Sequence, residues 1–430
     1  MGILMAVLAN ITVISSGMGI GYPATTLPLL SEASTDVKLT DAQASWFASI
    51  TAIFSPIGGL LSGYMLDKFG RRMTLICINV ISIISWLIIG YSSKSNVNVL
   101  FAQLMLARII IGVAVGMSSS PATVYAAEIS HPILRGRLTL LSALCTAVGM
   151  LFVYLLGYLL PADYRLVSLV SAGFTCFSLL VLLPIVESPT WLVEKRRLSS
   201  AQNALAVVRG IELYKPLSIM ITFFAFQQFS GIFVIFVYAA QFSKQAGVPI
   251  DPLLSAVYIG VTRVVTTILM AYISDKFGRK PPAFFSGFGM FASMMGLAAC
   301  SAYPLADTDF NWVPMFLLLF FVFSCTLGFL TLPFAMIAEM YPQRTRGFAA
   351  GLTICAGYFM SFINIKAYPS LLDSLGNEII FIFYGIVSLL GVFFVHFILP
   401  ETKGKSLQEI ENYFRDERKP ETEIEMLSKS

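Results

Sequence analysis

Long apolar segments alternate with short polar loops along the whole chain. A helix needs roughly 20 apolar residues to cross a bilayer, and twelve segments approach or exceed that length. A polar stretch at residues 187–215 separates the sixth segment from the seventh, and a charged tail follows the twelfth. The pattern predicts twelve transmembrane helices near 1–24, 44–66, 73–92, 99–124, 138–160, 165–186, 217–242, 252–274, 281–303, 312–337, 348–372 and 378–399.

The composition agrees with a membrane protein. Of the 430 residues, 57% are hydrophobic and only 12% are charged, whereas about a quarter of a soluble domain is charged. The first segment lacks a basic flank and a clear cleavage site, so we interpret it as a span rather than a signal peptide. The six cysteines lie in apolar segments without paired spacing. We expect no disulfides, no metal site, no cofactor and no enzymatic activity, because no nucleophile–base pair or phosphate loop stands out.

Three motifs occur twice. The hexamer at 67–72 recurs at 275–280, 208 positions later. Two further pairs recur with offsets of 211 and 214: Glu128…Arg135-Gly136 with Glu339…Arg346-Gly347, and Glu187-Ser188 with Glu401-Thr402. Near-equal offsets indicate a parallel duplication with the substrate path between the halves.

This duplication predicts a domain division and an orientation. We expect a six-helix bundle at 1–187, a short linker at 188–215, a second bundle at 216–400 and a tail at 401–430. Lysines and arginines crowd the loops on the side of the repeated hexamers, and the loops on the other side hold only Lys38, Lys94, Arg165 and Lys244. The positive-inside rule therefore places the hexamers, the linker and both termini in the cytoplasm.

Acidic and arginine residues recur at the helix ends on the basic side. A guanidinium binds a carboxylate through two parallel hydrogen bonds, and such pairs can separate when water enters. We expect a cytoplasmic gate built from Asp67, Arg71, Glu128, Arg135, Asp275, Arg279, Glu339 and Arg346. The alternative is that these charges only mark topology, which is our interpretation of Lys68, Arg72 and Lys276.

Three basic residues lie inside predicted spans. A charge in hydrocarbon costs at least about 2.5–3.5 kcal/mol, so each should face protein or a wet cavity. We expect Arg108 to pair with a carboxylate and Lys366 to extend toward the membrane surface. Arg263 has no acid nearby in sequence, and it is a candidate for either a functional site or a pairing between helices.

No Asp or Glu lies deep within a span. A proton-driven symporter normally needs such an acid as its titrating group, so we expect passive transport. His396 could titrate, but a lone histidine there is expected to be a packing residue. In the seventh span, the adjacent amides Gln227 and Gln228 offer donors and acceptors together, which suits a hydroxyl-rich ligand. The alternative for these amides is hydrogen bonding between helices.

Together these motifs resemble the sugar porters of the major facilitator superfamily. The resemblance rests on Gly63…Asp67-Lys68-Phe69-Gly70-Arg71-Arg72, Pro121…Tyr125…Glu128…Arg135-Gly136, Glu187-Ser188-Pro189…Trp191, Gln227-Gln228-Phe229-Ser230-Gly231 and Pro400-Glu401-Thr402-Lys403-Gly404. Within that family, Gly21-Tyr22-Pro23 and Gln43-Ala44-Ser45-Trp46-Phe47 are most similar to the insect facilitated trehalose transporters.

The resemblance implies an all-α membrane fold of two pseudo-symmetric six-helix halves. It also implies sugar binding by Gln227 and Gln228, with Tyr238 closing over the ligand. Several lining positions depart from the family: its helix-five glutamine falls on Ala143, and its helix-eight asparagine falls on Arg263. The implied substrate-binding set is Gln227, Gln228, Tyr238, Arg263, Phe334 and Tyr358.

The expected function is therefore passive uniport of a sugar, trehalose or a hexose, across the plasma membrane by alternating access. The expected partners are a small sugar and the lipid bilayer, without nucleic acid or an obligate protein partner. Two alternatives stay open. The chain could carry a non-sugar solute, such as an organic anion attracted by Arg263, or it could be a non-transporting sensor, since much of the lining and the linker depart from the family pattern.

Overall fold

The structure is a computed structural model, and its regular elements are all helices within the residues it describes. The linker expected at 188–215 and the tail expected at 401–430 lie almost entirely outside that part of the chain. The backbone is described for residues 2–31, 38–93, 96–129, 135–161, 163–188, 214–303, 309–341, 346–403 and 409.

Each predicted span falls on helical residues. The first half of the chain contains α1 (Gly2–Ser31), α2 (Asp41–Phe69), α3 (Arg71–Gly90), α4 (Val97–Met117), α5 (Pro121–Ile129), α6 (Arg135–Leu159) and α7 (Tyr164–Leu182). The second half contains α10 (Tyr214–Phe229), α11 (Ile232–Val237), α12 (Ala239–Gln245), α13 (Pro252–Phe277), α14 (Lys280–Ala302), α15 (Val313–Leu327), α16 (Leu332–Met340) and α17 (Arg346–Phe397).

Ten described helices are long and apolar enough to cross a membrane. One of them is α17, whose 52 residues contain a non-helical residue, Gly376, with φ of 78°. It therefore represents two predicted spans. The seventh predicted span is divided into α10, α11 and α12, each too short to be counted alone. With these two adjustments the described helices account for the twelve predicted passes.

The first helix differs from the prediction at its end. The sequence predicts a polar loop from residue 25, but α1 continues to Ser31 with Pro23 and Pro28 inside it. Neighbouring helices allow proline within transmembrane helices, because side chains and local adjustments satisfy the freed backbone groups. Pro23, for example, cannot donate to the carbonyl of Gly19, and the Arg108 side chain donates to this carbonyl instead, at 2.6 Å.

Glycines bring helices of the first half into backbone contact. A Cβ added at Gly149 on α6 would lie 2.0 Å from the carbonyl oxygen of Ile14 on α1, and one at Gly17 would lie 2.2 Å from that of Thr146. The contact of α2 with α4 is similar, since a Cβ at Gly116 would lie 1.9 Å from the Ser55 oxygen. Small residues at such interfaces let transmembrane helices approach closely.

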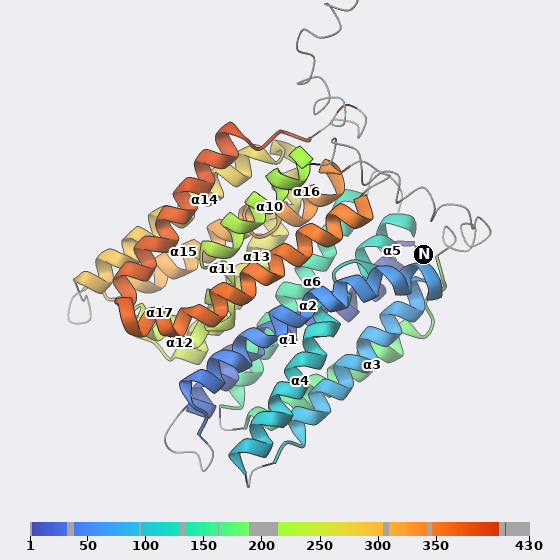
Figure 1. The fold of residues 1–430 in the computed structure, drawn as a ribbon, viewed down its shortest axis with the longest axis horizontal. Helices are drawn as coiled ribbons and strands as arrows, with labels where there is room; N and C mark the ends of the chain where they lie inside the picture. The colour runs from blue at the N-terminus through green and yellow to red at the C-terminus, as the bar shows by residue number, and fades with distance from the viewer. Residues whose placement is uncertain are drawn as a thin grey trace, which may run out of the picture.

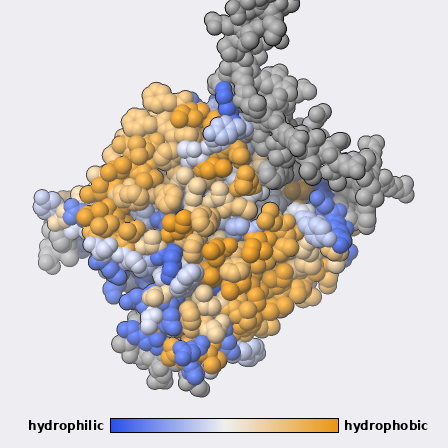
Figure 2. Space-filling view, in the orientation of Figure 1, coloured by the Kyte–Doolittle hydropathy of each residue, from blue (hydrophilic) through white to orange (hydrophobic). Residues whose placement is uncertain are grey.

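The helices of the two halves form two groups that lie side by side (Figure 1). Helix α2 packs against α17 and α6 packs against α13, and these are the main contacts between the groups. Hydrophobic residues cover most of the visible surface, and hydrophilic residues gather toward its ends (Figure 2). This distribution suits a surface surrounded by lipid.

Breaks interrupt spans of the second half at Gly231, at Tyr238 and at residues 328–331. Gly231, between α10 and α11, has φ of 85°, which favours glycine, and a Cβ there would meet the Tyr384 ring at 2.6 Å. Residues 328–331 separate α15 from α16. Broken helices at membrane depth expose backbone groups, and transporters use such places to build binding sites.

Candidate functional site

We define the basic face as the end of the bundle that carries residues 67–72 and 275–280, and the opposite face as the other end. On the basic face, Arg71 and Glu128 form an ion pair. The Nη2–Oε1 distance is 2.5 Å, the Nε–Oε2 distance is 3.0 Å, and the side chains are 8% and 16% exposed. The Ser188 hydroxyl also donates to Glu128, at 2.5 Å. This network joins α3, α5 and the chain that leaves α7.

The second half repeats the network. Arg279 donates to Glu339, with Nη2–Oε1 at 2.7 Å, and the Thr402 hydroxyl donates to the same carboxylate at 2.5 Å. These two charged side chains are more exposed than their counterparts, at 19% and 28%. The duplicated sequence motifs therefore correspond to a duplicated cluster of side chains, one in each half.

A second carboxylate in each half binds the N-terminus of the helix that begins within the repeated hexamer. Glu187 accepts the backbone N–H of Arg71 at 2.8 Å, at the N-terminus of α3. Glu401 accepts that of Arg279 at 3.0 Å and that of Lys280 at 2.9 Å, at the start of α14. The exposed N–H groups of a helix N-terminus attract an anion. The repeated sequence motifs indicate that these acids occupy equivalent positions, but they do not predict this role at the helix N-termini.

Glycine is required beside both of these acids. Gly70 and Gly278 have φ of 89° and 88°, in the left-handed region. A Cβ at Gly70 would lie 2.4 Å from a Glu187 oxygen. The repeated Phe-Gly-Arg sequence thus provides the turn that lets a carboxylate reach the backbone.

The eight predicted gate residues are only partly described. The structure brings Arg71 to Glu128 and Arg279 to Glu339, within one half in each case. The side chains of Arg135, Asp275 and Arg346 lie outside the described part of the structure, and Asp67 makes an interaction whose partner is not described. The described ion pairs therefore hold each half together, and a gate between the halves stays a prediction.

Glu401 should make stability depend on pH. Burial raises the pKa of its carboxyl, but hydrogen bonds from the backbone N–H groups of Lys280, Lys403 and Arg279 and the charge of Arg279 outweigh burial, so the pKa is lowered from 4.5. A carboxyl with a depressed pKa stabilises the folded state above its unfolded pKa, and this stabilisation is lost as the pH falls through the folded value. We expect the melting temperature of the wild type to exceed that of Glu401→Gln at pH 7.

The difference between the two proteins should shrink below about pH 4.5. Thermal unfolding of both proteins in detergent, from pH 7 downward, measures this difference. A gap that stays constant down to the acid limit of folding would contradict the role given to the charged carboxylate. Glu378→Gln, which neutralises an exposed acid on α17, is the control.

Four residues join the two halves near the opposite face, and we call this group the opposite-face latch. They are Ser45, Trp46, Phe362 and Lys366. The Lys366 ammonium donates to the Ser45 hydroxyl at 2.6 Å and lies 4.4 Å from the centre of the Trp46 ring. The Trp46 and Phe362 rings are 5.9 Å apart. A hydroxyl and an aromatic face of the other half bind the Lys366 ammonium about one turn from the start of α2, and the expectation that this side chain extends toward the membrane surface stays a prediction.

Two further contacts between the halves lie in the same part of the bundle. The Tyr154 hydroxyl of α6 donates to the Phe236 carbonyl of α11 at 2.5 Å. Arg263 of α13 contacts the sulfur of Met150 on α6. Counted along their helices, these residues are nearer the opposite face than the basic face. Within the described residues, the hydrogen bonds and ring contacts between the halves therefore lie between the middle of the bundle and the opposite face.

Gln227 and Gln228 are both buried on α10. Gln227 donates to the carbonyls of Phe329 and Leu330, at 2.8 and 3.0 Å, and so satisfies backbone groups at the break between α15 and α16. Gln228 donates to the Gln227 side chain at 3.2 Å, and its own Oε1 has no described partner. Of the two amides, Gln228 has the acceptor that is available to a ligand hydroxyl.

The other predicted substrate residues are dispersed over the second half. Tyr238 is buried, and its hydroxyl approaches the Ile365 carbonyl at 3.4 Å. Phe334 on α16 is 40% exposed and packs edge-on against Phe224, with the ring centres 5.0 Å apart. Tyr358 on α17 is half-buried.

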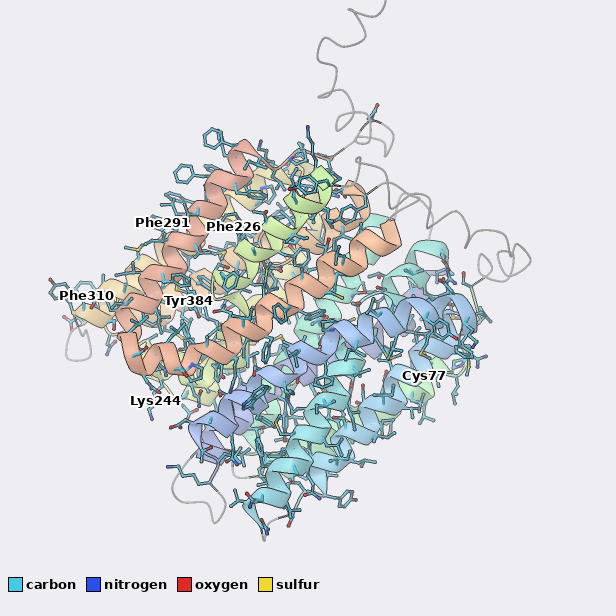
Figure 3. All side chains as sticks on the ribbon, viewed as in Figure 1. Cys77, Phe226, Lys244, Phe291, Phe310 and Tyr384 are labelled. Carbon is cyan, nitrogen blue, oxygen red and sulfur yellow. The ribbon has the colours of Figure 1, made fainter. Side chains whose placement is uncertain are left out.

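Asn364 lies beside the amide pair and is not among the site residues predicted from the sequence. Its Nδ2 donates to the Gln228 carbonyl at 2.6 Å, and its Oδ1 accepts from the Tyr384 hydroxyl at 3.2 Å. Tyr384 lies on α17 within the second half (Figure 3). A lone asparagine inside the apolar segment 348–372 was the signal available, since an amide in a span needs partners.

The two buried arginines of the spans have different surroundings. Arg108 donates to the carbonyls of Gly19 at 2.6 Å and Phe47 at 3.0 Å, so the expected pairing with a carboxylate is wrong. Backbone carbonyls of close-packed helices replace it, because Gly19 brings the α1 backbone within reach of the guanidinium. The Arg263 guanidinium lies 4.5 Å from the Phe236 ring centre, and its Nε has no partner within the described structure.

The chain matches the family profile described as "Sugar (and other) transporter" twice, over residues 3–216 and 206–414. It is 29% identical, over 94% of its length, to "Facilitated trehalose transporter Tret1" of Anopheles gambiae, and it spans 55% of that relative. It is also 29% identical, over 88% of its length, to "Facilitated trehalose transporter Tret1-2 homolog" of Drosophila simulans, of which it spans 83%.

The fold matches solved structures of a bacterial transporter. One is titled as the major facilitator superfamily proton:xylose symporter XylE bound to 6-bromo-6-deoxy-D-glucose; the TM-score is 0.79 at 24% identity, covering 96% of this chain and 98% of that one. Another is the inward open conformation of XylE from E. coli, with a TM-score of 0.79 at 24% identity over 95% and 98% of the chains. At this level of identity the likeness concerns the fold.

Proposed function

Because the chain belongs to the sugar (and other) transporter family, we propose that it carries a sugar, trehalose or a hexose, across the membrane by alternating access. It is an all-α, multi-pass membrane protein with the major facilitator fold. The relatives that support trehalose as the substrate are named for that sugar, and the chain spans about half the length of the Anopheles relative. The substrate and the direction of transport therefore belong to the proposal.

The observation that carries the proposal is the uneven distribution of contacts between the halves. The opposite-face latch, the Tyr154 hydrogen bond and the Arg263 contact all join the halves on one side of the bundle. On the basic face, the described ion pairs act within each half. A protein that exposes a site to alternate sides needs two rigid halves joined by contacts that can break.

We assign the basic face to the cytoplasm and the protein to the plasma membrane, with both termini inside. The moving units in this proposal are residues 1–187 and 216–400, joined by the linker at 188–215. The structure then corresponds to a state closed toward the outside. Transport would require the opposite-face latch to open as the halves approach each other on the cytoplasmic side.

The mechanism we propose is passive uniport. The middle parts of the described spans contain no Asp or Glu, so the described core holds no carboxylate that could carry a coupled proton. Gln228 would accept a hydrogen bond from a sugar hydroxyl, and the breaks beside Gly231 and residues 328–331 place backbone groups near it. Gln227 would act through its contact with Gln228 and by holding the second break.

Purified protein in liposomes tests this function. We expect saturable uptake of radiolabelled trehalose or glucose without an applied proton gradient, and no increase when the outside is made acidic. Acceleration of at least about tenfold by a pH gradient would overturn uniport. Absence of uptake of every sugar, with sugar binding retained, would favour the sensor alternative.

Weakening the opposite-face latch should shift the conformational equilibrium. The double variant Trp46→Ala, Lys366→Met removes a partly exposed cation–aromatic contact of about 0.5–1 kcal/mol, equal to a roughly two- to fivefold change in population. We expect faster backbone hydrogen exchange over residues 41–50 in detergent. Lys244→Met removes an exposed lysine near the same face and is the control. Equal exchange in the double variant and the control would show that the latch does not hold this face closed.

A further inference from the structure

Arg263 lies between the two halves on α13 and is only 7% exposed. Its guanidinium contacts the Phe236 ring of its own half and the Met150 sulfur of the other half. Neither group carries a negative charge, and no carboxylate contacts Arg263 within the described residues. The position therefore places a positive charge on the surface where the halves meet.

The donors of this guanidinium are poorly satisfied. An arginine has five N–H donors, and a thioether is a weak acceptor. Nη1 points at the Met150 sulfur, and Nε is buried without a partner. Leaving a charged donor unpaired in a protein interior is costly, so buried arginines usually find acceptors.

Other described arginines at comparable depth or in the charged clusters have oxygen acceptors. Arg108 donates to two backbone carbonyls, and Arg71 and Arg279 each bind a glutamate. Arg263 is thus the buried arginine whose described contacts leave the charge without an oxygen partner. An ionisable residue inside the membrane without a charged or oxygen partner is a candidate for binding a ligand.

A half-open groove lies on the basic-face side of Arg263, which is not itself among the residues that line it. It has a volume of about 200 Å³ and lies between the 140–144 segment of α6 and the 267–272 segment of α13. Thr267 lines it and follows Arg263 by four residues, so both lie on the same face of the helix. Its walls are mostly apolar, which strengthens the attraction of a charge for an anion.

We propose that Arg263 binds an acidic group of the transported solute, so that the protein prefers a sugar acid over the neutral sugar of the same size. This inference rests on the proposed sugar transport and specifies the substrate class. A carboxylate fits the planar guanidinium through two parallel hydrogen bonds. It would supply the oxygen acceptors that Met150 and Phe236 do not.

Glucose and glucuronate form a matched pair of probes, because they differ in one carboxylate on the same ring. In liposomes that contain the wild type, we expect glucuronate to inhibit labelled glucose uptake about tenfold more strongly than unlabelled glucose does. In Arg263→Gln the ratio of the two inhibition constants should fall by about tenfold or more. Arg263→Lys should retain part of the preference, and Lys244→Gln, which removes an exposed positive charge, should not change it.

Charge movement gives a second readout. Passive transport of glucuronate carries a negative charge, so an inside-positive potential set with potassium and valinomycin should raise its uptake, whereas glucose uptake should not respond. Thermal shift in detergent measures binding independently of transport. We expect glucuronate to stabilise the wild type and to stabilise Arg263→Gln less.

The possible failures are distinguishable. Glucose uptake without inhibition by glucuronate overturns the anionic subsite and leaves the proposed function intact. Inhibition by glucuronate that persists in folded Arg263→Gln also overturns it. Stabilisation by glucuronate that depends on Arg263, in a protein that transports no sugar, supports the subsite and overturns the proposed transport. If Arg263→Gln does not elute as a single species, Arg263→Lys decides, since equal ratios in this variant and the wild type would then count against recognition by the planar guanidinium.

Discussion

The variant Gly149→Val is expected to lose the folded transporter. At this position α6 touches the backbone of α1, and even a Cβ would lie 2.0 Å from the Ile14 carbonyl oxygen. The obstacle is backbone rather than a flexible side chain, so valine must push two helices apart. Overpacking in a core costs typically 1–3 kcal/mol, and we expect about 3 kcal/mol or more here.

Size-exclusion chromatography in mild detergent measures the outcome. Gly149→Val should elute as aggregate or give little protein, while the matched variant Gly173→Val on α7, where nothing lies within 4 Å of an added Cβ, should elute like the wild type. Normal elution and an unchanged melting temperature for Gly149→Val would contradict the close contact of α1 with α6.

The second large effect is expected from Glu128→Gln. This change leaves the nearly buried Arg71 without its carboxylate and weakens the hydrogen bond from Ser188. Breaking one partner of a buried ion pair costs about 3–5 kcal/mol, because the remaining charge stays unpaired. The equivalent Glu339→Gln should cost less, since Arg279 and Glu339 are 19% and 28% exposed and water can replace part of the lost interaction.

Thermal unfolding of the two variants in the same detergent compares the halves directly. The order of melting temperatures should be wild type, Glu339→Gln, then Glu128→Gln. Glu378→Gln removes an exposed carboxylate and should match the wild type. Equal losses in both halves would show that burial does not set the strength of these pairs.

Much of the fold could be predicted from the sequence, because lipid requires long apolar helices whose lengths can be read directly. The pairing of Arg71 with Glu128 and of Arg279 with Glu339 was also within reach, since equal offsets between repeats indicate equal environments. The continuation of α1 to Ser31 was not, because the apolar pattern weakens where neighbouring helices still support the backbone.

The candidate site was less predictable than the fold. The separate roles of Gln227 and Gln228 depend on the break between α15 and α16, which lies about a hundred residues away in sequence. Asn364 and Lys366 find partners on other helices, and no local pattern announces those partners. Arg263 was noticed as a charge in a span, but only its contacts show that an oxygen partner is missing.

The glycine contacts of the first half have a mechanical consequence. Helices that touch through their backbones, as α1 and α6 do beside Gly149, cannot slide or compress without a clash. The first half should therefore rotate as a rigid body during transport. The displacement of each atom should then grow with its distance from the rotation axis. Within the described residues, spans of the second half are interrupted at Gly231, at Tyr238 and at residues 328–331, whereas the first half has such an interruption at residues 118–120. The second half therefore contains more places where a bend can be absorbed. A small rearrangement of side chains near the rotation axis would then separate the two halves widely at the end of the bundle farthest from that axis.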